Sequence, residues 1–99
     1  MVEFAIDGWC WAYPFCDEKQ FTVAISKARR LGFDGIEVPV ENPEKLNVPK
    51  LRETLQANEL PPCNITPILG EIISLDREER VQAKQRAKRN IEIAKQILG

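Results

Sequence analysis

The sequence predicts an α/β fold of the form βαβαβα with parallel strands. Three short segments with strand character begin near residues 4, 35 and 62, and each precedes a longer segment whose apolar residues recur at helical spacing. Strands that alternate with helices pair in parallel through right-handed crossovers. No linker or low-complexity stretch divides residues 1–99, so we expect a single domain region without an internal boundary.

The first strand is predicted from Glu3 to Ala12, because Phe4 and Ile6 alternate with small or polar residues and Pro14 follows. Its carboxyl end is aromatic and comprises Trp9, Trp11, Tyr13 and Phe15. Flat side chains at that end of a strand can line a pocket or pack in the core. We expect one of the two tryptophans to line a pocket and the other aromatic residues to pack.

The first helix is predicted to begin at Asp17, with Gln20 as the reciprocal partner of a capping box. Its expected buried residues are Phe21, Ala24, Ile25, Ala28 and Leu31. Gly32 suits the left-handed turn that ends a helix, and Asp34 with Gly35 indicates a tight turn before the next strand.

The second strand, predicted over residues 36–40, carries the carboxylate Glu37. Parallel α/β folds place their chemistry at the carboxyl ends of buried strands, which makes Glu37 a candidate site residue. A buried carboxylate is costly unless it is partnered. Glu37 therefore either accepts a hydrogen bond from a substrate hydroxyl or pairs with a buried arginine, and one carboxylate alone is not an acid–base pair.

Residues 41–43 break the chain after this strand, and Asn47 with Pro49 opens a second helix that directs Leu51 and Leu55 inward. Asn58 is expected to close this helix.

The third strand is predicted from Pro62 to Leu69, followed by a loop over residues 70–75. Cys63 lies among apolar neighbours, which favours a small buried side chain over a nucleophile. It can still border a pocket.

The last helix is predicted after Asp76, which forms a capping pair with Glu79. Its expected buried stripe is Ala83, Ala87, Ile91, Ala94 and Leu98. The many basic residues of this helix alternate with glutamates and indicate a solvated outer face. Gly99 ends the helix where a further strand is expected, so we expect the chain to be part of a longer one.

Composition argues against several classes of function. The formal net charge is -1, which is not the basic footprint of a nucleic-acid binder. No apolar run approaches roughly 18 residues and no signal segment is visible, so we expect no membrane partner and a cytoplasmic location, with Cys10, Cys16 and Cys63 reduced. The chain has no histidine, hence no Ser-His or Cys-His nucleophile pair and no histidine metal ligand. No nucleotide-binding glycine motif occurs.

Three features together resemble the amino-terminal part of the xylose isomerase-like (β/α) barrel superfamily, which includes the D-tagatose 3-epimerase-like sugar phosphate isomerases and epimerases. They are the segment of residues 31–37, the aromatic end of the first strand, and Ser74-Leu75-Asp76 with Arg80 leading to residues 94–99. A TIM (β/α)8 barrel takes roughly 250 residues, so three of its βα units take somewhat over 90. The resemblance implies the first three units.

The resemblance also implies a metal-dependent reaction on a small-molecule sugar. A divalent metal (manganese, magnesium or cobalt) is expected on residues of later strands, where carboxylates move a proton through an enediolate. No catalytic or metal-binding residue is then expected within residues 1–99, and this segment alone should be inactive. The candidates for the pocket wall are Trp9, Trp11, Glu37 and Cys63.

Two alternatives remain at this stage. A barrel endonuclease would need basic loops at the barrel mouth, yet Lys45 is the only basic residue of the expected loops 12–17, 41–47 and 70–76. The other alternative is a non-enzymatic α/β module that self-associates. Three strands alone would expose a sheet edge and an apolar barrel interior, so we expect either self-association or a remainder of the barrel to cover them.

Overall fold

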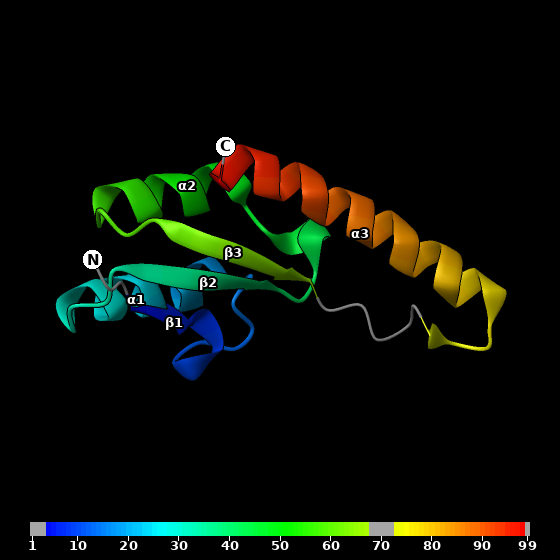
Figure 1. The fold of residues 1–99 in the computed structure, drawn as a ribbon, viewed down its shortest axis with the longest axis horizontal. Helices are drawn as coiled ribbons and strands as arrows, with labels where there is room; N and C mark the ends of the chain where they lie inside the picture. Colours follow the sequence, from blue (N-terminus) through cyan, green and yellow to red (C-terminus); the bar gives the residue numbers. More distant parts are fainter. Residues whose placement is uncertain (1–3, 68–72, 99) are drawn as a thin grey trace.

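A computed structural model describes residues 4–67 and 73–98 of the chain (Figure 1). One parallel sheet has the order β1-β2-β3, with β1 at Ala5–Asp7, β2 at Gly35–Val40 and β3 at Pro62–Pro67. The helices that follow the strands are α1 (Glu18–Arg30), α2 (Val48–Ala57) and α3 (Arg77–Leu98). The predicted βαβαβα order is confirmed. The expected end of the third strand at Leu69 lies outside the described residues, as do residues 70–72 of the loop.

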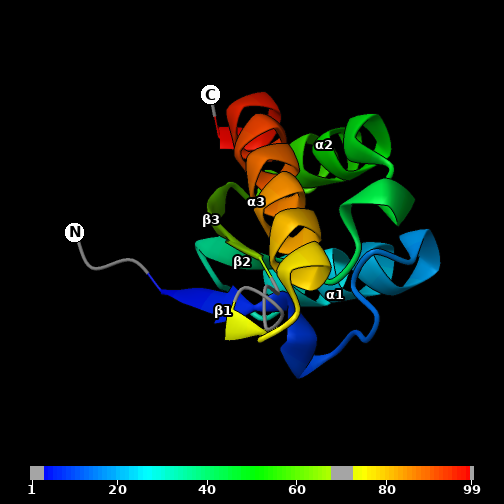
Figure 2. The same cartoon turned by 90° about the vertical axis from the view of Figure 1, so that its right-hand side faces the viewer.

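The core lies between the sheet and the helices, with α1 and α2 on the same side of the sheet (Figure 2). Ile36, Val38 and Val40 of the central strand β2 are at most 1% exposed. They pack in one cluster with apolar residues of α1 and α2, among them Phe21 and Leu51. Since successive side chains of a strand point to opposite faces, the residues between these three lie on the other face of the sheet.

Two of the predicted helix starts form as expected from local chemistry. The Asp17 carboxylate accepts a hydrogen bond from Gln20 N at 3.2 Å, and the Asn47 side chain accepts one from Lys50 N at 3.1 Å. The predicted capping box also requires a reciprocal hydrogen bond from Asp17 N to the Gln20 side chain. This part of the prediction is wrong, because Asp17 N donates to the Pro14 carbonyl at 3.3 Å instead.

The connection from α1 to β2 differs from the prediction in two places. Gly32 has a φ of 89°, which confirms the left-handed turn, but Leu31 caps the helix and is 58% exposed rather than buried. Gly35 lies in β2 and not in a turn. A Cβ there would lie 3.1 Å from the Pro61 carbonyl oxygen, which accepts a hydrogen bond from Ile36 N. Glycine therefore permits the close approach of the segment before β3.

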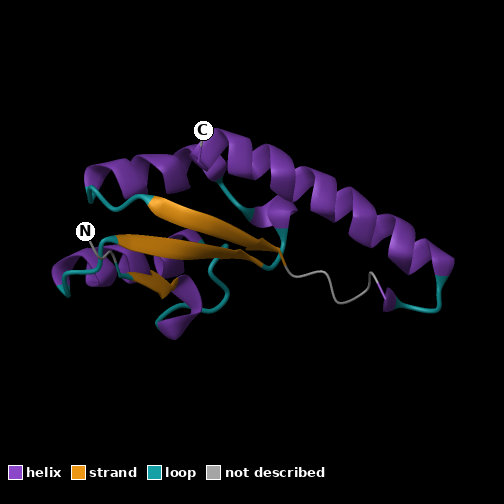
Figure 3. Ribbon diagram, in the orientation of Figure 1, coloured by secondary structure: helices purple, strands orange, loops and turns teal. Residues whose placement is uncertain are grey.

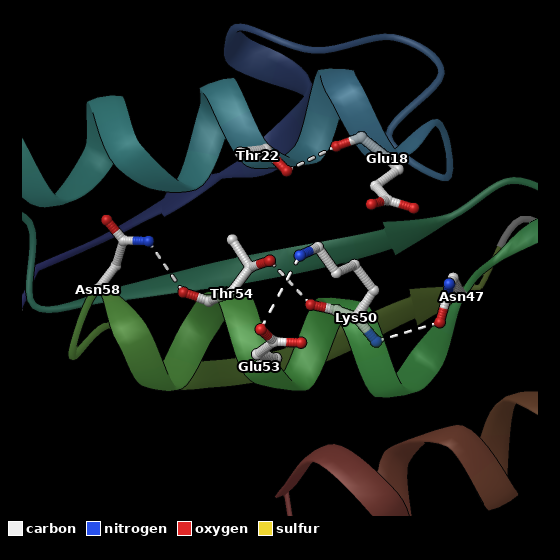
Figure 4. A network of polar contacts seen from close by, with 7 residues as sticks. All are labelled: Glu18, Thr22, Asn47, Lys50, Glu53, Thr54 and Asn58. Carbon is white, nitrogen blue, oxygen red and sulfur yellow. Dashed lines mark hydrogen bonds and ion pairs between the residues drawn. The ribbon is translucent and has the colours of Figure 1, made fainter.

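Polar side chains in α1 and α2 bond mainly to carbonyls of their own helix (Figure 4). Thr22 donates to the Glu18 carbonyl at 2.7 Å, and Thr54 donates to the Lys50 carbonyl at 2.8 Å. Asn58 caps α2, as predicted, and its amide donates to the Thr54 carbonyl at 2.9 Å. The hydroxyl of the buried Thr54 and the amide of Asn58 thus find their hydrogen-bond partners within α2 itself.

The predicted buried stripe of α3 is wrong at two of its five positions. Ala83 is buried as expected and Ala87 and Ala94 are half-buried, but Ile91 and Leu98 are 59% and 46% exposed. The residues that face the core are instead Asn90 and Ile93, at 4% and 0% exposure. The buried face of α3, which packs toward β3 and α2, therefore includes Ala83, Asn90 and Ile93 and leaves out Ile91 and Leu98.

The start of α3 also uses a different partner from the one predicted. The Asp76 carboxylate accepts a hydrogen bond from Glu78 N at 2.8 Å and so caps the helix. The Glu79 carboxylate does not return to Asp76 but accepts a hydrogen bond from the Ser74 hydroxyl.

The amino-terminal part of α3 extends past the ends of the strands (Figure 3). The molecule is accordingly elongated, with principal extents of 44 × 26 × 25 Å.

The orientation of α3 can be tested with two isoleucines that are two positions apart. Ile93→Ala should lower the free energy of unfolding by about 2–4 kcal/mol, because it leaves a cavity in the core. Ile91→Ala, the control, should change it by less than about 1 kcal/mol. Denaturant unfolding at matched protein concentration measures both, and equal losses would contradict the described orientation.

Candidate functional site

A row of polar side chains crosses the three strands on the face opposite the core. Asp7 is the register partner of Glu37, and Glu37 is the partner of Asn64. The Asn64 amide donates to the Glu37 carboxylate at 3.4 Å, and the Thr66 hydroxyl donates to the Asn64 side-chain oxygen at 3.5 Å. Opposed residues in a sheet share a face. This face of the sheet therefore carries polar side chains at these positions, beside the apolar residues expected for a barrel interior.

Glu37 lies in this row as a half-buried carboxylate. Among the described residues its hydrogen-bond partner is the amide of Asn64 and not the buried arginine considered from the sequence. An acceptor-only carboxylate beside an amide, which can donate and accept, offers both kinds of hydrogen bond to a polar ligand.

The first strand is shorter than predicted and ends at Asp7. The Asp7 carboxylate accepts a hydrogen bond from Trp9 N at 2.8 Å and starts a short 3-10 helix, η1 (Gly8–Cys10), in place of the predicted strand residues. Gly8 is buried against the Phe15 ring, where a Cβ would lie 2.4 Å from a ring carbon. The backbone after β1 consequently curls back over the carboxyl end of the sheet.

The two tryptophans of this segment separate. Trp9 is 39% exposed and meets Tyr13 edge to face, with ring centroids 5.5 Å apart. Trp11 packs instead against Phe33, which precedes β2, and the Lys27 ammonium lies 5.5 Å from its ring centroid. Only Trp9 is thus placed beside the carboxyl end of β2.

Glu41, which directly follows β2, organises this end of the sheet. Its carboxylate accepts hydrogen bonds from Phe15 N at 2.7 Å, from Cys16 N at 3.1 Å and from the indole N–H of Trp9. The sequence indicates only a chain break at residues 41–43, so this role of Glu41 is not predicted from it. The signal was a carboxylate one residue beyond a buried strand.

Glu41 and Cys16 influence each other's ionisation. Burial by itself favours the neutral form of Glu41, but hydrogen bonds from Trp9, Cys16 and Phe15 outweigh it and hold the pKa of this carboxyl below its usual 4.5. Burial, followed by the smaller effects of the Glu41 acceptor and charge, raises the pKa of the Cys16 thiol to about 11. At neutral pH the pair is therefore a carboxylate beside a neutral thiol.

The lowered pKa of Glu41 predicts how this residue contributes to stability as pH changes. A carboxyl group with a depressed folded-state pKa stabilises the fold above its unfolded pKa, and this contribution is lost as pH falls through the folded value. Glu41→Gln should cost about 1–3 kcal/mol at neutral pH, since an amide cannot accept from all three donors. The difference from the unmodified chain should shrink on acidification well below the usual 4.5. Thermal unfolding across that range measures it, and a constant difference would contradict the assignment.

Cys63 is exposed, contrary to the expectation of a buried side chain. It lies on β3, which pairs only with β2 in the described sheet, beside the register shift between Ile36 and Glu37. Partial desolvation of the thiol, followed by the charge of Glu37, raises the pKa of Cys63. Because its pKa is raised, Cys63 is a neutral thiol at neutral pH. It lies at the edge of the polar row.

The three cysteines should therefore differ in reactivity toward a thiol reagent. Cys10 and Cys63 are exposed and should be alkylated in the native protein, with Cys63 slowed by its raised pKa. Cys16 is buried and should react only after unfolding. Timed alkylation with iodoacetamide followed by peptide mass mapping gives the order, and rapid native labelling of Cys16 would contradict the described packing.

The residues that the structure describes do not provide a metal site: no group of three or more aspartates, glutamates, cysteines or histidines among them could hold a metal ion. The metal implied by the resemblance therefore does not fit the described part of the chain. Among the same residues, no helix has the length and apolar character needed to cross a membrane.

Three parallel strands in sequential order, each followed by a helix, are the first three βα units of a TIM (β/α)8 barrel. Two crystal structures of D-allulose 3-epimerase from Methylomonas sp. share this fold, one of them in complex with D-allulose. Their TM-scores are 0.82 and 0.83 at 18% and 19% sequence identity, over 99% of this chain. The chain spans about a third of the length of these structures, 34% and 35%. No protein-family model and no curated protein matches its sequence.

Proposed function

We propose that residues 1–99 are the amino-terminal segment of a metal-dependent sugar or sugar-phosphate epimerase or isomerase. The observation that carries this proposal is the agreement with D-allulose 3-epimerase over 99% of the chain at a TM-score of 0.82. The chain spans 34% of that structure, so the segment would supply barrel scaffold and part of the substrate pocket while the rest of the barrel supplies the remainder.

In this proposal the pocket wall combines one aromatic surface with one polar surface. Trp9 offers an indole face against which the apolar face of a sugar ring can stack. Glu37 and Asn64 offer acceptors and a donor for sugar hydroxyls, with Cys63 at the edge of the same row. Trp11, which packs against Phe33, is not included.

The proton-transfer chemistry is assigned to residues beyond this segment. A divalent metal bound there would polarise the carbonyl and hydroxyl oxygens of the sugar. The described part of the chain contributes binding and orientation: the carboxylate of Glu41 is occupied by three donors from the loop, and Glu37 is one carboxylate beside an amide.

The proposal predicts an inactive segment within an active longer protein. The 99-residue chain, incubated with D-allulose and Mn²⁺, should show no epimerisation, measured by chromatographic separation of the ketoses. The native coding sequence should continue in frame past Gly99 and encode the remaining units of the barrel. Glutamate, aspartate and histidine should lie at the ends of those later strands.

Two results would contradict this reading. Epimerisation by the 99-residue chain alone would overturn the assignment of the chemistry to later residues. A stop codon directly after Gly99 would overturn the enzyme segment itself and favour the self-associating module. The exposed Ile91 and Leu98 of α3 would then offer apolar surface for association.

A further inference from the structure

We infer that Glu41 is a positioning residue that fixes the Trp9 indole at the carboxyl edge of the sheet, as the flat wall of the sugar pocket. The role of the wall rests on the proposed function, whereas the positioning rests on the geometry of Glu41 and its three donors.

The Glu41 carboxylate connects the loop between β1 and α1 to the end of β2. Trp9 lies at the beginning of the loop between β1 and α1, and Phe15 and Cys16 lie at its end. All three donate to Glu41, which extends from the end of the neighbouring strand β2. One side chain therefore holds both ends of the loop against the end of the sheet.

The position of Trp9 depends on its hydrogen bond to Glu41 more than the positions of Phe15 and Cys16 depend on theirs. Phe15 is fully buried in the core and Cys16 is nearly so, which holds their backbone in place without Glu41. Trp9 is 39% exposed, and its ring partner Tyr13 is itself 71% exposed. A charge-assisted hydrogen bond to the indole N–H is then the contact that selects one orientation of the ring. Because the indole is already oriented, less conformational entropy is lost when a ligand binds against it.

Glu41 is unsuited to a direct part in proton transfer. Oε2 accepts from Trp9 and Phe15, and Oε1 accepts from Cys16. An acid or base at this position would have to give up these bonds to reach a substrate. The arrangement therefore favours orientation of the pocket over chemistry.

The test uses Trp9 as the sole indole, in a Trp11→Phe background that keeps an aromatic ring beside Phe33. Glu41→Gln should raise the acrylamide quenching constant of Trp9 about twofold, because this residue moves from 39% exposure toward full exposure. Glu44→Gln is the matched control, since it removes the same charge at an exposed position of the 3-10 helix η2 (Pro43–Lys45). An unchanged quenching constant in Glu41→Gln, or an equal rise in the control, overturns the inference.

A second measurement separates positioning from loss of folding. Trp9→Phe keeps a ring but removes the indole donor, so its stability cost should overlap with that of Glu41→Gln in a double-mutant cycle. Additive costs would overturn the inference. Glu41→Asp keeps the charge and should restore part of the protection from acrylamide, which a nonspecific packing role would not do.

The proposed function is tested separately by titrating D-allulose into the complete barrel that it expects, with Trp9 kept as the only tryptophan. A change in Trp9 emission that weakens in Glu41→Gln supports both the wall and its positioning. No change in emission with the sugar argues against Trp9 as a sugar wall in this chain, while the quenching comparison still decides whether Glu41 positions the ring.

Discussion

The alternation of β2 is the constraint on which the other features depend. Ile36, Val38 and Val40 are buried toward the helices, which turns Glu37 to the opposite face. Because β2 pairs with both neighbours, its register also decides what lies beside Glu37 on β1 and β3. A slip of one residue would bury the carboxylate in the core and expose the apolar side chains. Both changes would destabilise the fold strongly. The same strand places Glu41 at its end.

The candidate site combines two surfaces with different physical origins. The polar row follows from pairing within the sheet and needs no long-range side-chain contact beyond the strands. The aromatic surface depends on a loop that returns to the strand end and is held there by a buried ring, Phe15, and by a charged acceptor, Glu41. In a barrel of this kind, the polar row on the strands can stay the same while the loop sequence changes the aromatic surface. This agrees with the general rule that loops at the carboxyl ends of strands carry function.

Local chemistry made the fold predictable, whereas tertiary partners made parts of the site unpredictable. Asp17, Gly32 and Asn47 act through bonds or backbone angles within a few residues, so their roles can be predicted from the sequence. The outward Cys63 and the buried Asn90 depend on which neighbour β3 and α3 meet, and helical spacing alone does not specify that neighbour. The strand predicted as far as Ala12 failed for a third reason, because the Asp7 carboxylate binds the backbone of Trp9 and ends the strand early.

The projecting helix α3 gives the molecule a permanent electric asymmetry. It carries seven basic and three acidic residues, a net of +4, and the formal total of -1 leaves -5 on the rest of the chain. The positive helix lies along one side of a body 44 Å long, and its first turns extend beyond the negatively charged sheet and loops (Figure 1). Such a charge distribution orients approaching partners at a distance comparable to the Debye length, about 10 Å at 0.1 M salt. Ionic strength therefore sets the distance over which an approaching molecule feels the difference in charge between α3 and the rest of the chain.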